Sequence, residues 1–440
     1  MNSLHYGVTP KMKPVSAKRT AVVAALDVGT SKIACLVAKL KPQAPQEVLR
    51  RRSHAVEIKG ISHTVARGMK AGAVVDLAET ENAISHAVDL AERMAGVQFE
   101  SVVVSVSAGR IGSELFAASV DVGGPTVSEG DIARVLAAGS RHSVRDGRAL
   151  LHSLPISYSL DGVTGVRDPR DMLARNFGVD MHVMTADIAA ARNLMLAIER
   201  CHLNVEAMVA SPYVSGLAVL ADDEADLGSA VIDMGAGTTT LAVFSAGHCV
   251  YASGFAVGGY HVTMDIARGL NTRVADAERI KTFYGSVLTG GSDERDMITV
   301  PPVGDDEREA TQFVSKASLV GIIKPRVEEI LEMIRDRLAA SPFAAEPRAR
   351  VVLTGGASQL NGLPELAARI LGRQVRIGRP LGIAGLPDEA KGPAFAVAAG
   401  LLVYPQAAHL EHFEPRRTRQ LMTGTGGYMN KVGQWLRESF

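Results

Sequence analysis

A short pattern that occurs twice is the feature that most constrains the fold of this chain. It reads LDVGTSK at residues 26–32 and IDMGAGTTT at residues 232–240. Each copy has an apolar run that ends in an aspartate and is followed by glycine and small hydroxyl residues, which predicts a β-hairpin with a tight turn. Two copies of one hairpin predict two equivalent lobes of mixed α/β structure.

The composition of the two turns predicts that they bind phosphate. Glycine lets the backbone come close to an anion, and the turn amides form a cradle for its oxygens. Asp27 and Asp233 are expected to face each other across a cleft and to hold Mg²⁺ through water, because that ion keeps several waters beside phosphates. One copy alone would be an ordinary hairpin, and the pair carries the prediction. Hydroxyl donors are expected from Thr30, Ser31, Thr238 and Thr239.

Other phosphate-binding and catalytic motifs are excluded. Gly235-Ala236-Gly237 begins like a dinucleotide fingerprint, but Thr240 stands where the third glycine should be. The dipeptide Gly-Lys does not occur, which excludes a Walker A loop, and neither HExxH nor GxSxG is present.

A third glycine turn follows the two hairpins, in VVLTGGAS at residues 351–358. Gly355 and Gly356 come after a buried strand and would let a flat base or ribose pass closely, so an adenosine loop is predicted here. In DAERIK, Glu278 and Lys281 share one helix face at a spacing of three, where a structural ion pair is the ordinary explanation.

The length and the charge of the chain limit the class of protein to which it can belong. The chain has 440 residues with 47% hydrophobic content, which predicts two or more lobes. Lysine plus arginine equals aspartate plus glutamate at 47 each, so no net charge favours nucleic acid. Three cysteines without a CxxC pair predict free thiols in a reducing cytoplasm. No run approaches the roughly 20 apolar residues that span a bilayer.

Several segments differ in composition from the two lobes. We expect a disordered basic arm over residues 1–20 and a small α+β insertion over 104–183, in which Ser128 and Asp131 form a helix capping box. A polar loop is expected from 285 to 308, and a linker from 405 to 427.

The pattern of apolar and polar residues in the last segment, 428–440, predicts an amphipathic helix that lies in a membrane interface. Thirteen residues are too short to span a bilayer. Because Lys431 and Arg437 are offset by Glu438 and the terminal carboxylate, a single copy should bind weakly, and firm attachment should need several linked copies. The alternative is a helix docked on the protein's own core. The apolar stripe consists of Tyr428, Val432, Trp435, Leu436 and Phe440.

With these elements in this order, the chain resembles the FtsA family of bacterial division proteins within the actin and sugar-kinase superfamily. The resemblance covers nearly the whole chain: both hairpins, IERCHLNVEAMVASPYVSGLAVLADDE, DAERIK, VVLTGGASQLNGLPELA, QVRIGRPLGIAGL and the terminal WLRESF. It implies an actin-like (ribonuclease H-like) two-lobed ATPase fold with a C-terminal amphipathic helix. The implied subdomains are 1A (21–103, 184–212 and about 391–404), 1C (104–183, an SHS2-like insertion), 2A (213–256 and 332–390) and 2B (257–331).

The resemblance also implies ligands and partners. The partners are the FtsZ C-terminal tail, other copies of the chain in actin-like filaments, later divisome membrane proteins and the inner face of the cell membrane at the division site. Arg308, Lys324 and Arg326 lie in the stretch that matches 2B and suit an acidic tail, although solvated surface charge explains them equally well. The implied ATP-binding residues are Asp27, Gly29, Thr30, Ser31, Lys32, Asp233, Gly235, Gly237, Thr238, Thr239, Gly258, Gly259, Glu278, Lys281, Gly355, Gly356 and Ala357.

Two related functions stay open at this point. A pilus-assembly protein of the PilM type would share the insertion but lack the terminal amphipathic helix. A small-molecule kinase of the superfamily would need a catalytic base, and no candidate stands out in the sequence. Weak ATP hydrolysis or none is therefore expected, with the nucleotide acting as a switch.

Overall fold

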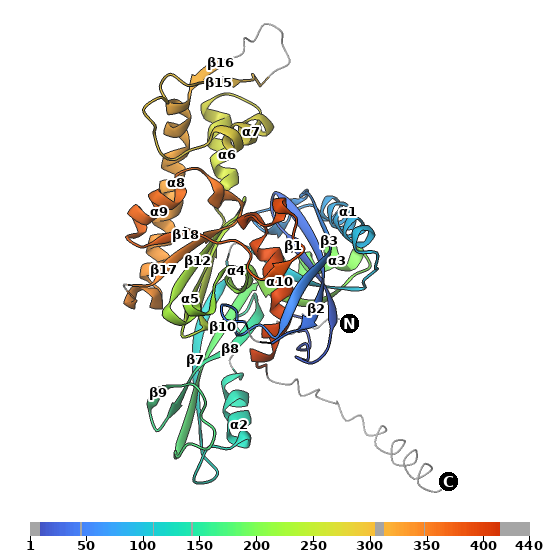
Figure 1. Cartoon of the computed structure of the whole chain (residues 1–440), viewed down its shortest axis with the longest axis vertical. Coiled ribbons are helices and arrows are strands. Elements are labelled where there is room, and N and C mark those ends of the chain that lie inside the picture. Colours follow the sequence, from blue (N-terminus) through green and yellow to red (C-terminus); the bar gives the residue numbers. More distant parts are fainter. Residues whose placement is uncertain are drawn as a thin grey trace, which may run out of the picture.

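Two lobes with matching sheets form the body of the molecule (Figure 1). The computed structural model of the chain describes residues 9–413, apart from 45, 109, 142–143, 304–311 and 347. The first lobe holds a six-stranded sheet in the order β11-β6-β1-β2-β3-β19. Its strands are β1 (Ala21–Val28), β2 (Lys32–Pro42), β3 (His54–Val65), β6 (Ser101–Val106), β11 (Asn204–Ala210) and β19 (Ile383–Ala384).

The second lobe repeats this arrangement with a five-stranded sheet in the order β14-β13-β12-β17-β18. In each lobe the hairpin strands are antiparallel, and the first of them continues the sheet through parallel neighbours, β6 in one lobe and β17 in the other. The prediction of two equivalent lobes is confirmed. The strands are β12 (Ser229–Met234), β13 (Thr239–Ser245), β14 (His248–Phe255), β17 (Arg350–Thr354) and β18 (Val375–Ile377).

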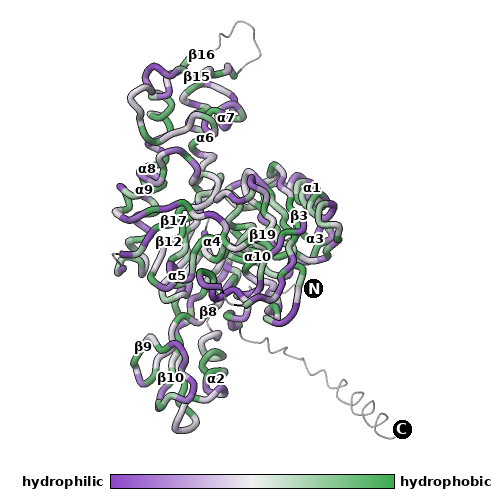
Figure 2. The backbone as a smooth tube through the Cα atoms, viewed as in Figure 1, coloured by the Kyte–Doolittle hydropathy of each residue, from purple (hydrophilic) through white to green (hydrophobic). Residues whose placement is uncertain are grey.

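Helices cover the sheets and join the lobes. In the first lobe, α1 and α3 pack beside β3 and β11, and α10 packs on the other face against β1 (Figure 1). Helix α4 contacts α10 and also β12 and β13 of the second lobe, so it lies between the two. Hydrophobic residues follow the central strands and α10, whereas the outer loops are mostly hydrophilic (Figure 2). The helices are α1 (Leu77–Ala95), α3 (Ile188–Arg200), α4 (Ser211–Val219), α5 (Asp222–Leu227), α9 (Leu363–Leu371) and α10 (Ala396–Ala407).

A separate four-stranded sheet extends from the first lobe at the predicted insertion (Figure 1). The Ser128 side chain and Asp131 form the predicted capping box at the start of its helix. Phe177 and Met181 lie in a core of its own. Because β6 belongs to the first-lobe sheet as far as Val106, the insertion starts slightly later than residue 104. Its elements are β7 (Gly112–Asp121), α2 (Glu129–Gly139), β8 (Arg148–Leu160), β9 (Val163–Val166) and β10 (Asn176–Asp187).

The second lobe carries a small subdomain at its far end, where the sequence predicts 2B (Figure 1). A two-stranded ribbon lies here. It pairs residues 297–300, which are inside the predicted polar loop, with residues 312–315, which follow that loop. The elements of this subdomain are α6 (Gly259–Gly269), α7 (Val274–Tyr284), β15 (Met297–Val300), β16 (Gln312–Ser315) and the first part of α8 (Lys316–Ala339). A short ribbon of β4 (Met69–Lys70) and β5 (Ala73–Val74) completes the described strands.

Both ends of the described chain differ from the sequence prediction. The arm expected to be disordered contacts the protein within residues 9–15: Thr9 is buried, its amide donates to the Leu150 carbonyl at 3.2 Å, and the Val15 amide donates to the Pro405 carbonyl. The linker expected from 405 starts later, because α10 continues to Ala407 and residues 408–410 form a further turn. Residues 1–8 and 414–427 lie outside the described part.

Helix α10 is also the one described helix that is long and apolar enough to cross a membrane, as part of residues 393–410. However, 78% of that window is buried inside the protein. Such burial is what the core helix of a globular protein shows. The three cysteines are free thiols, as predicted.

Candidate functional site

A cleft of about 1250 Å³ separates the two lobes, and both predicted hairpins line it. The hairpins close in the same way: the Gly29 amide donates to the Lys32 carbonyl at 2.9 Å, and the Gly235 amide donates to the Thr238 carbonyl at 2.9 Å. The Gly-Gly turn after β17 and the faces of α6 and α7 complete the walls. Elements far apart in the sequence thus form one site.

Glycine is required where the walls come together. Gly355 has φ +84°, and a Cβ there would lie closer than 3.0 Å to Asp233 Oδ1 and to the Met234 carbonyl. A Cβ at Gly237 would collide with the side chain of Thr30, because the two hairpins touch across the cleft. The absence of a side chain at Gly237 therefore makes room for Thr30 and lets the two hairpins come close together.

Two aspartates lie at the floor of the cleft, one from each lobe. Ser105 donates a hydrogen bond to Asp27 Oδ1 at 2.7 Å. Removal from water raises the pKa of Asp27, against the bond from Ser105 and the charge of Lys32. Removal from water and the charge of Asp27 raise the pKa of Asp233 to about 7, although Lys32 opposes both. A cation between the two carboxylates would relieve their repulsion and keep both ionised.

These carboxylates fit Mg²⁺ held mainly by water and phosphate. Within the described residues, no group of three or more His, Cys, Asp and Glu side chains is arranged to hold a metal ion. Mg²⁺ in nucleotide sites ordinarily takes one or two carboxylates and completes its shell with water and phosphate oxygens. Asp27 and Asp233 are two such carboxylates and could hold the ion through its waters.

Lys32 provides the positive charge beside the aspartates. Its Nζ donates to the Ala394 carbonyl at 2.6 Å and lies 3.5 Å from the centre of the Phe395 ring. Burial lowers the pKa of Lys32, whereas Asp27 and Asp233 raise it. The ammonium group thus joins the first hairpin to the segment just before α10.

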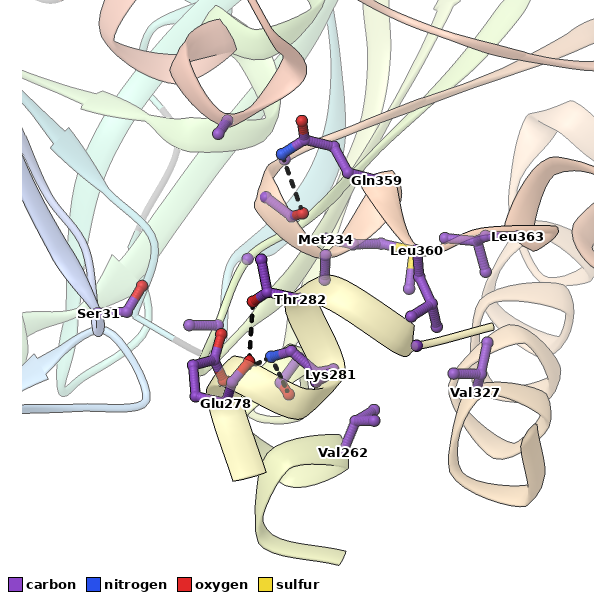
Figure 3. Close-up of a pocket in the computed structure, with 18 of the residues that line it drawn as sticks. Ser31, Met234, Val262, Glu278, Lys281, Thr282, Val327, Gln359, Leu360 and Leu363 are labelled. Atoms are coloured by element: carbon purple, nitrogen blue, oxygen red, sulfur yellow. Dashed lines mark hydrogen bonds and ion pairs between the residues drawn. The ribbon is translucent and has the colours of Figure 1, made fainter. Parts of the chain in front are cut away.

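At the other end of the cleft, α7 presents Glu278 and Lys281 (Figure 3). Lys281 Nζ lies 2.7 Å from Glu278 Oε2 and also donates to Thr263 Oγ1 at 2.8 Å and to the Gly259 carbonyl at 3.1 Å. The ion pair that the helical spacing indicates is present. It also faces the cleft, which the spacing alone does not show.

Two of the predicted ATP-binding residues lie behind the cleft wall. Thr239 is buried, and its Oγ1 donates to the Val257 carbonyl at 2.8 Å. Gly258 packs so closely that a Cβ would collide with the Gly235 carbonyl. The others line the cleft: Asp27, Gly29, Thr30, Ser31, Lys32, Asp233, Gly235, Gly237, Thr238, Gly259, Glu278, Lys281, Gly355, Gly356 and Ala357.

The sequence reasoning missed several lining residues. Ser107 and Ser211 directly follow the strands β6 and β11, and Phe283 and Tyr284 end α7. The first pair has a recognisable signal, because residues just after parallel strands gather at one edge of a sheet. The aromatic pair has no such signal, since two exposed aromatic residues at a helix end are ordinary.

Three basic residues were expected to bind an acidic partner, and the two that the structure describes are already in ion pairs within the protein. Arg326 Nε lies 2.6 Å from Asp265 Oδ2, which joins α8 to α6, and Arg326 also pairs with Glu329. Lys324 Nζ lies 3.9 Å from Glu328 Oε1. Arg308 and the predicted membrane-binding residues, including Lys431, Trp435 and Arg437, lie outside the described residues.

Comparison with family models gives two matches. The description "Cell division protein FtsA" matches residues 230–400, and "SHS2 domain inserted in FTSA" matches residues 108–185. The second range holds β7 to β10, so the inserted sheet and the matched domain coincide apart from the last residues of β10.

Curated relatives match over the whole chain. Cell division protein FtsA of Agrobacterium fabrum (strain C58) is 52% identical over 439 residues, which cover 100% of this chain and 99% of that protein. Cell division protein FtsA of Escherichia coli (strain K12) is 31% identical over 433 residues, which cover 97% of this chain and 100% of that protein.

Solved structures with low sequence identity share the fold. One is a chain of the PilM-PilN type IV pilus biogenesis complex, at 18% identity and a TM-score of 0.59, which covers 87% of this chain and 98% of that one. Another is MreB5 of Spiroplasma citri bound to ADP, at 14% identity and a TM-score of 0.52, which covers 89% of this chain and 98% of that one. These likenesses show an actin-like fold, as predicted.

Proposed function

The chain belongs to the FtsA family of cell division proteins, and from this premise we propose that it is an ATP-binding, filament-forming protein that tethers the FtsZ ring to the membrane. In this proposal it lies on the cytoplasmic side of the inner membrane at the division site and helps to recruit later divisome proteins. ATP acts as a switch, with weak hydrolysis or none.

The observation that carries the nucleotide part is the paired closure of the two hairpins around Asp27 and Asp233. Both turns present backbone amides, and Thr30, Ser31 and Thr238 add hydroxyl groups to the same cleft. Such a cradle suits the phosphates of ATP. Mg²⁺, held by the two aspartates through water, would neutralise phosphate charge.

The far end of the cleft suits the adenosine. Gly356, where a Cβ would meet only Ala394 at 3.9 Å, leaves space beside a flat ring, and Glu278 and Lys281 present polar groups to a ribose or base. In the free protein Lys281 already holds Glu278 in place, so little side-chain ordering is needed on binding.

The second hairpin is also joined directly to subdomain 2B, which supports a switch. The Gly259 and Tyr260 amides, at the start of α6, donate to the carbonyls of Gly235 and Ala236 at 2.9 and 2.8 Å. A phosphate that orders the turn of this hairpin would therefore also order the base of α6. We propose that bound ATP favours the arrangement of 2B that joins copies into filaments.

Subdomain 2B is also the proposed site for the acidic FtsZ tail. Lys324 remains the best described candidate, because its partner Glu328 is at the limit of an ion pair. Arg326 is a poorer one, since Asp265 and Glu329 already hold it. An exposed apolar face of the β15–β16 ribbon, formed by Met297 and Phe313, lies in the same subdomain.

Membrane attachment is assigned to residues 428–440. Their apolar stripe would bury in the lipid interface, while their small net charge contributes little attraction. Binding by one copy is then weak, and linked copies in a filament hold firmly because later binding events become intramolecular.

Co-sedimentation with vesicles that contain anionic lipid tests this proposal. The full chain with ATP and Mg²⁺ should pellet with vesicles, whereas a chain that ends at residue 427 should stay in solution. Equal pelleting of the two would overturn the anchor assignment. Equal pelleting of the full chain and a form unable to polymerise would overturn the need for linked copies.

A matched pair of substitutions separates the apolar face from general effects of charge. W435E places a carboxylate on the apolar stripe and should abolish pelleting. Q434E makes the same change in charge on the polar face and should lower it only slightly. Nucleotide binding, measured on both variants, should equal that of the full chain.

The two alternatives have no observation in their favour. The likeness to PilM extends to the fold alone, at 18% identity. A kinase would need an acceptor site with a catalytic base. Within the described part, four acidic side chains line the cleft. We assign Asp27 and Asp233 to Mg²⁺, Lys281 holds Glu278, and the fourth is Asp296.

A further inference from the structure

Ser211 is a buried residue of the cleft that lacks a hydrogen-bond partner. It is the first residue of α4, lines the cleft, and has 1% of its surface exposed. Among the described residues, its Oγ makes no hydrogen bond. Because buried hydroxyl groups nearly always have a partner, the partner of Ser211 is expected to come from outside the free protein.

The sheet register places Ser211 near the phosphate-binding hairpin. Strands β1, β6 and β11 are parallel, with Leu26 opposite Val104 and Val106 opposite Ala210. Their carboxyl ends therefore meet at one edge of the sheet, which carries both Asp27 and Ser211. Two strand spacings separate the two backbones, about 10 Å in all. A triphosphate held by the hairpins extends over such a distance.

Helix α4 connects this position to both lobes. It packs against β11 and α10 of the first lobe and against β12 and β13 of the second. All of its residues but Leu217 are buried. A ligand bound to Ser211 is thus bound to the element that lies between the lobes.

We propose that Ser211 Oγ donates a hydrogen bond to the terminal phosphate of bound ATP and so makes the cleft distinguish ATP from ADP. This inference rests on the proposed function, because it requires ATP in the cleft. Ser211 is here a binding residue. A serine hydroxyl is too weak a base at neutral pH to activate water, so the contact holds ATP without promoting its hydrolysis.

The test compares the affinities of S211A for ATP and for ADP, both with Mg²⁺. Loss of a hydrogen bond to a charged phosphate should weaken ATP binding by about tenfold or more, with ADP binding within about twofold of the wild-type value. S211T keeps the hydroxyl group and should keep most of the preference for ATP.

S215A is the matched control. Ser215 lies on the same helix and is fully buried, but its Oγ donates to the Pro212 carbonyl at 3.0 Å. S215A should be less stable than the wild type, with its ratio of ATP to ADP affinity unchanged. S211A should unfold at the same urea concentration as the wild type, because the free protein loses no hydrogen bond. If S211A does not fold, S211C tests the same contact with a weaker donor.

The outcomes are distinct. An unchanged ratio of ATP to ADP affinity in S211A, or an equal loss for both nucleotides, would overturn the role of Ser211 and leave the proposed function intact. Failure of the wild-type chain to bind either nucleotide would overturn the proposed function and this inference with it.

Discussion

His152 Nδ1 lies 2.7 Å from Glu411 Oε1, and both side chains are buried. The Ala210 amide donates to His152 Nε2 at 2.9 Å, so the ring proton is on Nδ1 and is donated to the carboxylate. Tyr404 donates to the same oxygen at 2.9 Å. His152 belongs to β8 of the insertion, and Glu411 follows α10. The pair therefore fastens the segment that leads to the C-terminal tail onto the base of the insertion.

Removal of the Glu411 carboxylate should destabilise the protein strongly. E411A leaves His152 and Tyr404 buried without their acceptor, and we expect a loss of about 3 kcal/mol in the free energy of unfolding. Urea unfolding measures it. D388A removes an exposed ion pair with Lys391 and should cost less than about 1 kcal/mol. Equal effects of the two substitutions would contradict the buried pair as a stabilising contact.

A second buried histidine, His182, should make the protein less stable as the pH falls. Burial lowers the pKa of His182 to about 4, although its bond to the Cys249 carbonyl raises it. In the unfolded chain this histidine binds its proton near pH 6.5, whereas in the folded protein it does so only near pH 4. The free energy of unfolding should therefore decrease by about 3 kcal/mol as the pH falls from 6.5 toward 4.

Urea unfolding from pH 7.5 to 5 measures the effect of His182. H182N should weaken the dependence on pH, because asparagine does not titrate in this range. His182 joins β10 to Ser113 of β7 and to Cys249 of β14, so loss of overall stability in this variant is also expected. An unchanged pH dependence would contradict the shifted pKa.

Gly355 and Gly356 should respond differently to alanine. G355A imposes a side chain at φ +84° beside Asp233, so we expect a loss of about 2 kcal/mol or more in stability and at least about a tenfold loss in ATP affinity. At Gly356 a Cβ would meet Ala394 at 3.9 Å, an ordinary contact, and G356A should fold normally. Thermal unfolding and nucleotide titration compare the two. Similar behaviour would contradict the close approach at Gly355.

Removal of Mg²⁺ should lower the ATP affinity only in a protein that keeps the two aspartates at the floor of the cleft. EDTA should lower the ATP affinity of the wild type by about tenfold or more, because phosphate then meets Asp27 and Asp233 without a cation between them. The double variant D27N/D233N should bind ATP with little dependence on Mg²⁺. A large effect of EDTA on that variant would place the ion elsewhere.

Much of the fold was predictable from local patterns. The repeated strand, aspartate and glycine turn predicted both hairpins and the equivalence of the lobes, because the turn chemistry and the apolar strands are encoded by neighbouring residues. The capping box at Ser128 and the Gly-Gly turn at Gly355 were predicted for the same reason. Asp27 and Asp233, read as facing residues, do line one cleft.

Other features depend on residues that are distant in the chain. The composition of residues 9–20 predicts disorder, but Thr9 and Met12 are buried, and the amides of Thr9 and Val15 find acceptors in β8 and α10. Pro405 and the polar residues after it predict a linker, yet Glu411 is held by His152. Thr239 resembles its neighbour Thr238 in sequence, and only strand alternation, set by the sheet, turns it away from the cleft.

The sequence by itself determined the two hairpins, their glycines and aspartates, and membership of the family, because these reside in contiguous motifs and in identity over the whole length. Tertiary structure decided which side chains share the cleft. It brought Ser211 to the edge that carries Asp27 and left its hydroxyl group without a partner, because β1, β6 and β11 pair only in the folded sheet.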